Sequence, residues 1–288
     1  MIRRHVTAPA PAGPAGRNRD RSGHTIIEVA LALVLFSIVL GTVYIALIAQ
    51  HRFYVRNAQL ASTRNAARVA AEVLTGELRA ASPAGGDLYA IAADSVALRS
   101  STGFGVVCSV SGNTIQLWRL TGTFGDSEND SALVFLENTL DTSQDDAWTA
   151  VRIRDVRSGG QGECPDGRSP TLRLVLDREL AGVIVGAPLR AFRPYVYKLY
   201  TGSDGRWWLG QRLRYGRFQP VTGPFAPPGE GGLRFEFLKR GGVPARDPAE
   251  VVEVRISIRA RSTHRMLWSG GARFLADTLS TAVYLRNS

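Results

Sequence analysis

The sequence predicts an α+β protein in which one long N-terminal helix packs on an antiparallel, β-rich globular domain. Two observations carry this prediction. Residues 25–81 contain no proline, and their apolar residues form first a continuous run and then a stripe with helical spacing. After Pro83 the apolar residues recur at every second position, which is typical of strands with one buried face. We therefore expect a leader over residues 1–23, a helix over residues 24–82 and a globular domain over residues 83–288.

The first half of the predicted helix has the length and composition of a transmembrane segment. Residues 25–49 hold a single charged side chain, Glu28, and a helix of this length spans about 37 Å, against about 30 Å for a bilayer core. The run is longer than the apolar region of a cleaved signal peptide. Arginines crowd the residues before it, with Asp20 as the one acid. The positive-inside rule therefore keeps the N-terminus in the cytoplasm and exports the chain after Ala49.

The second half of the predicted helix carries one apolar stripe. Its members are spaced 7, 3, 4, 4 and 3 residues apart, and they are Leu60, Ala67, Ala70, Leu74, Leu78 and Ala81. Charged side chains occupy the other faces, so the stripe is expected to dock on the globular domain. Ser82-Pro83 and Gly85-Gly86 end the helix.

Ten strands are expected in the globular domain. They are Ser95–Ser100, Gly105–Val110, Thr114–Leu120, Ala132–Glu137, Trp148–Arg154, Thr171–Leu176, Ala191–Tyr200, Trp207–Tyr215, Leu233–Leu238 and Val251–Arg259. The last two alternate most cleanly between apolar and charged residues. Gly202–Gly205 is expected to form a hairpin turn, residues 224–232 a loop, and Ser262–Arg265, which includes His264, a turn.

Glu28 needs an explanation, because an unpaired carboxylate in an apolar segment is costly. Residues 23–28 read Gly-His-Thr-Ile-Ile-Glu. This motif resembles the prepilin cleavage and methylation motif of type IV pilins and pseudopilins, with His24 where the family usually has Phe or Met. The resemblance implies that prepilin peptidase cuts between Gly23 and His24 and methylates the new N-terminus. It also implies that Glu28 pairs with the N-terminus of a neighbouring subunit in a filament. The alternative is a plain signal anchor with Glu28 at the membrane interface.

The later chain resembles PilW-type minor pilins and J-type minor pseudopilins of type II secretion. The similarity lies in residues 189–213, in Gly-Leu-Arg-Phe-Glu-Phe at 232–237 and in VVEVRISIRARS at 251–262. It implies a pilin-like structural subunit that primes or caps a type IV pilus or a type II secretion pseudopilus. The implied partners are other pilins or pseudopilins, prepilin peptidase and the assembly platform of the bacterial inner membrane. The globular domain would lie in the periplasm.

The two cysteines, Cys108 and Cys164, both lie in the exported part, where disulfides persist. They are expected either to form a disulfide or to remain two separate buried thiols.

No catalytic residues and no cofactor are expected, so the chain is not predicted to be an enzyme. After the apolar run the only histidines are His51 and His264, and no G-x-S-x-G, Walker or H-E-x-x-H motif is present. Asp126, Glu128, Asp130 and Glu137 occupy positions 1, 3, 5 and 12 of a calcium-loop pattern. Ser131 replaces the glycine at position 6, so an acidic solvated loop is preferred and no metal site is expected.

The formal net charge is +10, but the basic residues are spread along the chain and no nucleic-acid-binding motif accompanies them, so a nucleic-acid partner is not expected. The aromatic residues around Trp207 and Trp208 (Tyr195, Tyr197, Tyr200 and Tyr215) alternate with polar residues, which favours core positions over a binding surface. Two other functions remain open. They are a signal-anchored periplasmic binding module or enzyme, and a pilus-tip adhesin or DNA receptor.

Overall fold

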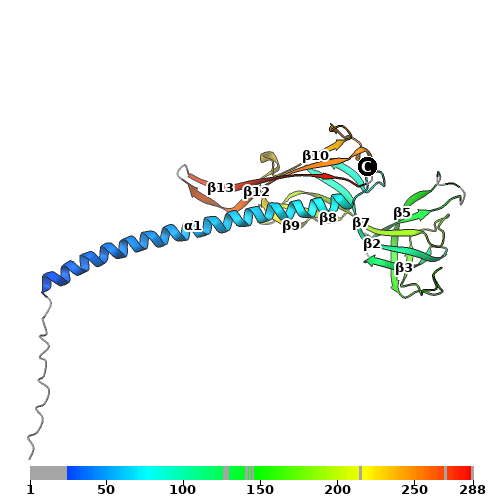
Figure 1. Ribbon diagram of the computed structural model, residues 1–288, viewed down its shortest axis with the longest axis horizontal. Helices are drawn as coiled ribbons and strands as arrows, with labels where there is room; N and C mark the ends of the chain where they lie inside the picture. The colour runs from blue at the N-terminus through cyan, green and yellow to red at the C-terminus, as the bar shows by residue number, and fades with distance from the viewer. Residues whose placement is uncertain are drawn as a thin grey trace, which may run out of the picture. The chain divides into compact units, whose positions relative to one another are not determined.

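The computed structural model describes residues 25–125, 130–139, 142, 144, 146–213, 216–268 and 271–286. It has one long helix, α1, over Ile26–Ala80, followed by a large antiparallel β-sheet (Figure 1), so the chain is of the α+β class. The chain forms two compact units, Met1–Tyr54 and Val55–Ser288. The boundary lies within α1 because the second half of the helix packs on the sheet.

The second unit contains, among the described residues, a sheet of thirteen strands. The strands are β1 (Leu88–Ala92), β2 (Ser95–Ser111), β3 (Thr114–Gly122), β4 (Ser131–Leu136), β5 (Ala147–Ser158), β6 (Leu172–Leu176), β7 (Pro188–Thr201), β8 (Trp207–Leu213), β9 (Gln219–Phe225), β10 (Leu233–Lys239), β11 (Val243–Pro244), β12 (Glu253–Trp268) and β13 (Gly271–Tyr284). They follow the order β1-β2-β3-β6-β5-β4-β7-β8-β9-β12-β10-β11, with β13 on β12 and a further pairing of β2 with β7. Two short 3₁₀ turns, η1 (Pro228–Glu230) and η2 (Pro248–Glu250), flank β10 and β11.

The first core joins the second half of α1 to residues of β1, β2, β7 to β10, β12 and β13. The helix contributes Ala66, Ala67, Ala70, Ala71, Leu74 and Leu78, all buried. This is the predicted stripe widened by two alanines, with Leu60 only half-buried at its start. Alanines at four of these six positions let the helix lie close to the sheet, and each fully buried leucine stabilises the contact by roughly 1.5–3 kcal/mol.

The second core has no contribution from α1. It is formed by residues of β2 to β7 and of the turn before β7, namely Val107, Ile115, Leu117, Ala132, Val134, Val151, Ile153, Leu172, Leu174, Leu176, Ala187, Leu189 and Ala191. β2 and β7 pair from Ser95↔Lys198 to Val106↔Pro188, so these two strands supply residues to both cores. A disulfide between Cys108 and Cys164 joins the connection between β5 and β6 to strand β2.

The alternation predicted for β10 and β12 matches the structure. Leu233, Phe235 and Phe237 are buried while Arg234 and Glu236 are exposed. On β12 the buried residues include Val254, Ile256 and Ile258, paired with β10 through Phe237↔Val254, Phe235↔Ile256 and Leu233↔Ile258. Gly202–Gly205 forms the expected hairpin turn, in which Gly205 N–H donates to the Gly202 carbonyl at 3.0 Å.

Several strand predictions were wrong. The segments Ser95–Ser100 and Gly105–Val110 are one strand, β2, because register shifts opposite β3 and β7 absorb the irregular residues between them. Pro224 lies in strand β9, not in a loop; its missing N–H is tolerated because β9 has register shifts against β8 and pairs with β12 only at Ala260↔Phe225.

The expected turn at Ser262–Arg265 is also wrong. His264 lies within β12, at a register shift between Arg261 and Arg265 that lets the strand continue. Ser262 holds this irregularity together, because its hydroxyl donates to the His264 carbonyl at 2.8 Å and accepts from Leu275 N–H at 2.9 Å. The hairpin partner β13 was not predicted at all.

A buried tyrosine links α1 to the sheet and makes stability depend on pH. The Tyr197 hydroxyl donates to Gln211 Oε1 at 3.3 Å, and burial, reinforced by the nearby carboxylate of Glu77, raises the pKa of Tyr197. The folded pKa therefore lies above the unfolded value of about 10. The contribution of Tyr197 to stability is fully present below that pH and is lost as the pH rises above it toward the folded pKa.

We expect the free energy of unfolding of the full chain in detergent to fall above pH 10 by up to about 1.4 kcal/mol per pH unit on account of Tyr197. In Tyr197→Phe this part of the slope should vanish, as measured by denaturant titration at several pH values. Tyr284→Phe is the matched control, because Tyr284 is 68% exposed. An identical slope in Tyr197→Phe and the wild type would contradict the prediction.

Candidate functional site

The N-terminus of α1 is closed by a reciprocal capping box. Thr25 N–H donates to Glu28 Oε2 at 2.9 Å, and Glu28 N–H donates to Thr25 Oγ1 at 3.3 Å. This Thr-x-x-Glu arrangement satisfies backbone N–H groups that have no partner within the helix, and it places a negative charge at the positive end of the helix dipole. Glu28 thus has a role within its own chain, which the Thr-x-x-Glu spacing could have indicated. Gly23 and His24 lie outside the described residues.

The helix surface beyond this cap is apolar and uncovered. Every residue from Thr25 to Tyr54 is exposed except Ile48, which is half-buried. The most apolar stretch has a mean hydropathy of 2.7 with none of its residues buried. Ser37 and Thr42 donate to helix carbonyls within four residues, so their hydroxyls stay satisfied without water. By length and composition, α1 can cross a membrane once.

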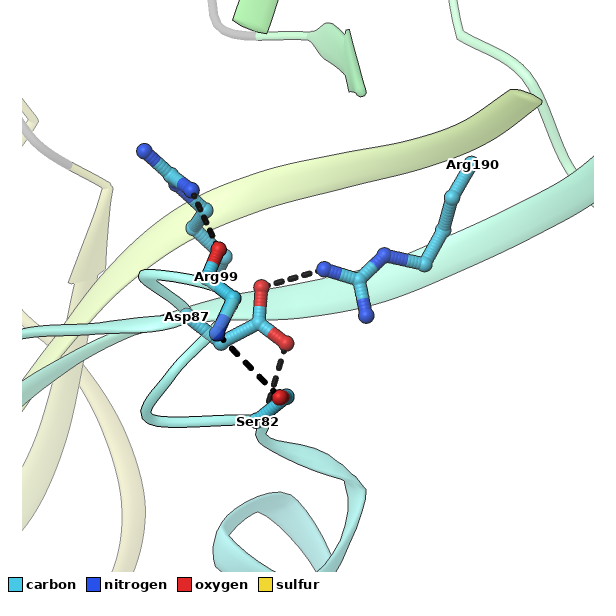
Figure 2. A network of polar contacts seen from close by, with 5 residues as sticks. Ser82, Asp87, Arg99 and Arg190 are labelled. Atoms are coloured by element: carbon cyan, nitrogen blue, oxygen red, sulfur yellow. Dashed lines mark hydrogen bonds and ion pairs between the residues drawn. The ribbon is translucent and has the colours of Figure 1, made fainter. Parts of the chain in front are cut away.

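The other end of α1 is tied to the sheet by a polar clasp, shown in Figure 2. Asp87, which is fully buried, accepts Ser82 N–H through Oδ2 at 2.9 Å and the Arg190 guanidinium of β7 through Oδ1. Asp87 N–H donates to the Ser82 carbonyl at 3.0 Å, and the Asp87 carbonyl accepts Arg99 N–H of β2 at 2.7 Å. The clasp therefore holds the end of α1 to β2 and β7, the two strands that serve both cores.

A second buried carboxylate, Asp130, forms a bidentate pair with Arg193, through Nε and through Nη2 at 3.1 Å. The hydrogen bond from Arg193 raises the pKa of that guanidinium, which stays charged. Asp130 belongs to the calcium-loop pattern considered above, and in the structure both of its oxygens face this cation. Asp126 and Glu128 of that pattern lie outside the described residues, and Glu137 is half-buried after β4. The described part of the chain contains no cluster of three His, Cys, Asp or Glu that could hold a metal ion.

The aromatic residues of β7 and β8 divide between the two faces of the sheet. Tyr197 is buried in the first core, and Tyr195 and Trp207 pack against it, as the sequence favoured. Tyr200 instead stacks on Phe218 at 5.5 Å between ring centroids, on the opposite face. Tyr215 lies outside the described residues.

The remaining ring of the set, Trp208, donates from Nε1 to Asp204 Oδ1 of the hairpin turn at 3.1 Å. Both histidines considered as catalytic candidates, His51 and His264, are exposed.

Comparisons of the chain with models of protein families, with curated protein sequences and with solved structures find no match.

Proposed function

We propose that the protein is a minor pilin or pseudopilin, a structural subunit that primes or caps a type IV pilus or a type II secretion pseudopilus. The observation that carries the proposal is the run Gly23–Glu28 at the start of an apolar helix that bears no other charge before Arg52. In such a subunit the chemistry is assembly, with processing at Gly23 and His24 followed by pairing of Glu28 with a neighbour.

The continuity of α1 supports this proposal. Its first half exposes apolar side chains on all faces, and these require lipid or the apolar helices of other subunits to cover them. Its second half packs on the first core through Leu74 and Leu78, and the Asp87 clasp fixes its end. A force that draws the helix out of the inner membrane is thereby passed to the periplasmic domain through packed side chains and an ion pair.

The size of the exported domain favours a minor subunit. The domain has two cores and long polar connections, such as residues 159–170 between β5 and β6. Such a domain is suited to a cap or a priming complex, where one side stays uncovered, rather than to a closely packed lattice.

The proposal predicts that the protein from membranes lacks residues 1–23 and carries one methyl group on the amino group of His24. Intact mass and N-terminal sequencing, with and without prepilin peptidase, measure this directly. Gly23→Val should leave the chain uncut, because the peptidase must fit the backbone at the cut. Gly41→Val is the matched control and should be cut normally, since nothing lies within 4 Å of the position of its new Cβ. An uncut wild-type N-terminus, or a cut after Ala49, would leave a signal-anchored binding module as the better account.

A glutamine at position 28 separates the two roles of Glu28. Because a glutamine at this position also completes a capping box, Glu28→Gln keeps the helix cap and removes only the charge. We expect Glu28→Gln to be processed but to lose co-purification with other pilins or pseudopilins after crosslinking. If it associates as well as the wild type, the charge pairing is not what joins the subunits.

A further inference from the structure

A basic pocket lies on the face of the sheet formed by β1, β2, β7, β4 and β5, which are neighbours in that order. The pocket has a volume of about 390 Å³. Cross-strand register brings its residues together: Arg99 of β2 lies opposite Pro194, and Ser131 of β4 lies opposite both Phe192 and Arg152. Residues in register share a face, so Phe192 forms an apolar floor with arginines on either side of it.

Three guanidinium groups line this pocket against one carboxylate. Arg99 is half-buried, and Arg152 and Arg178 are exposed. Asp177 uses Oδ1 to accept the backbone N–H of Arg152 at 3.3 Å. Among the described residues, no carboxylate lies within ion-pair distance of any of the three guanidiniums. The pocket therefore carries a net positive charge.

Arg99 is held at the pocket wall by weak contacts. Its guanidinium lies 5.1 Å from the centroid of the Phe192 ring, and Nη1 donates to the Gly85 carbonyl at 3.4 Å. Burial lowers the pKa of Arg99, and the positive charge of the nearby Arg190 lowers it further. The attraction of Asp87 opposes this shift only in part. An anion in the pocket would compensate this charge and use N–H groups that the protein leaves unused.

The hydrogen-bond donors that the pocket offers to a ligand are the guanidinium N–H groups of its arginines. The strand ladders occupy the backbone N–H groups of the lining strands, and Asp177 takes the N–H of Arg152. Planar guanidinium groups match carboxylates in a bidentate manner. Tyr89, 38% exposed at the rim, and Phe192 at the floor provide apolar surface for the carbon chain of a glutamate or aspartate.

We propose that this pocket binds an acidic, extended segment of a partner protein, with a carboxylate between Arg99, Arg152 and Arg178. The positive charge of the pocket favours an acidic ligand. This proposal does not depend on whether the chain belongs to a filament.

The test uses the full chain in a nonionic detergent and a fluorescein-labelled hexaglutamate peptide, followed by fluorescence anisotropy. We expect saturable binding that weakens as salt is added, and no binding of labelled hexaglutamine. The double variant Arg152→Gln/Arg178→Gln should lose about tenfold in affinity, as removal of two exposed ion pairs implies. The double variant Arg119→Gln/Arg217→Gln is the control, because it removes the same charge from exposed positions that do not line the pocket.

The two double variants decide the matter because they differ only in the position of the lost charge. Equal loss in both would show general attraction to a basic protein and would overturn the proposal. Binding of hexaglutamine as tight as that of hexaglutamate would do the same. If hexaglutamate is inert while inorganic phosphate binds the wild type and not Arg152→Gln/Arg178→Gln, the pocket serves a phosphate group and the proposed partner is wrong.

Discussion

Asp87→Ala is expected to lower the free energy of unfolding by about 3–5 kcal/mol, the cost of breaking a buried ion pair by removing one partner. Asp87 has no exposed surface, and the side chain of Arg190 is only 22% exposed. Without the carboxylate, Arg190 keeps a poorly solvated charge, and Ser82 N–H loses its acceptor. Denaturant titration of the full chain in detergent measures the loss.

The matched control is Asp166→Ala, because Asp166 and its partner Arg168 are 54% and 58% exposed and a pair of this kind contributes about 0–1 kcal/mol. Adding Arg190→Met to Asp87→Ala should recover part of the loss, since the uncompensated charge is then gone as well. If Asp87→Ala costs no more than Asp166→Ala, the clasp does not hold the end of α1.

Asp87 illustrates what the sequence could not predict. It follows Pro83 and two glycines, and by its local pattern it is an ordinary loop acid. Its importance comes from Arg190, which lies 103 residues later and meets it only because β2 and β7 are paired. No periodicity or spacing encodes such a long-range pair. The pairing of Asp130 with Arg193, 63 residues apart, escaped prediction for the same reason.

The features that could be predicted are those encoded within one element. The stripe on α1 and the alternation in β10 and β12 depend on residues three, four or two positions apart, so the buried faces were assigned correctly. Strand β13 was not predicted, because most residues of its sequence, GARFLADTLSTAVY, are small or polar and are not buried. It is a strand because it pairs with β12. The capping box at Glu28 also has a local signal, since Thr25 and Glu28 are three residues apart.

Removing the disulfide is expected to cost about 4 kcal/mol, because Cys108 and Cys164 close a loop across a sequence separation of 56 residues. Cys108→Ala/Cys164→Ala suits the test, since alanine leaves no thiol to form mixed disulfides and both sites are buried. Denaturant titration should show the double variant destabilised to the same extent as the wild type in reductant. Reductant should have no effect on the variant itself, and a variant within about 1 kcal/mol of the oxidised wild type would contradict the expectation.

The two cores predict which strands lose stability when the disulfide is removed. Cys108 lies on β2 next to Val107 of the second core, and the chain closed by the bridge includes β3, β4 and β5. The first core, on which α1 packs, contains no residue of that loop. Amide hydrogen exchange should therefore rise in β3 and β5 of the double variant and stay low in β10 and in the second half of α1. Equal rises throughout would mean that β2 and β7, which serve both cores, bind them into one cooperative unit.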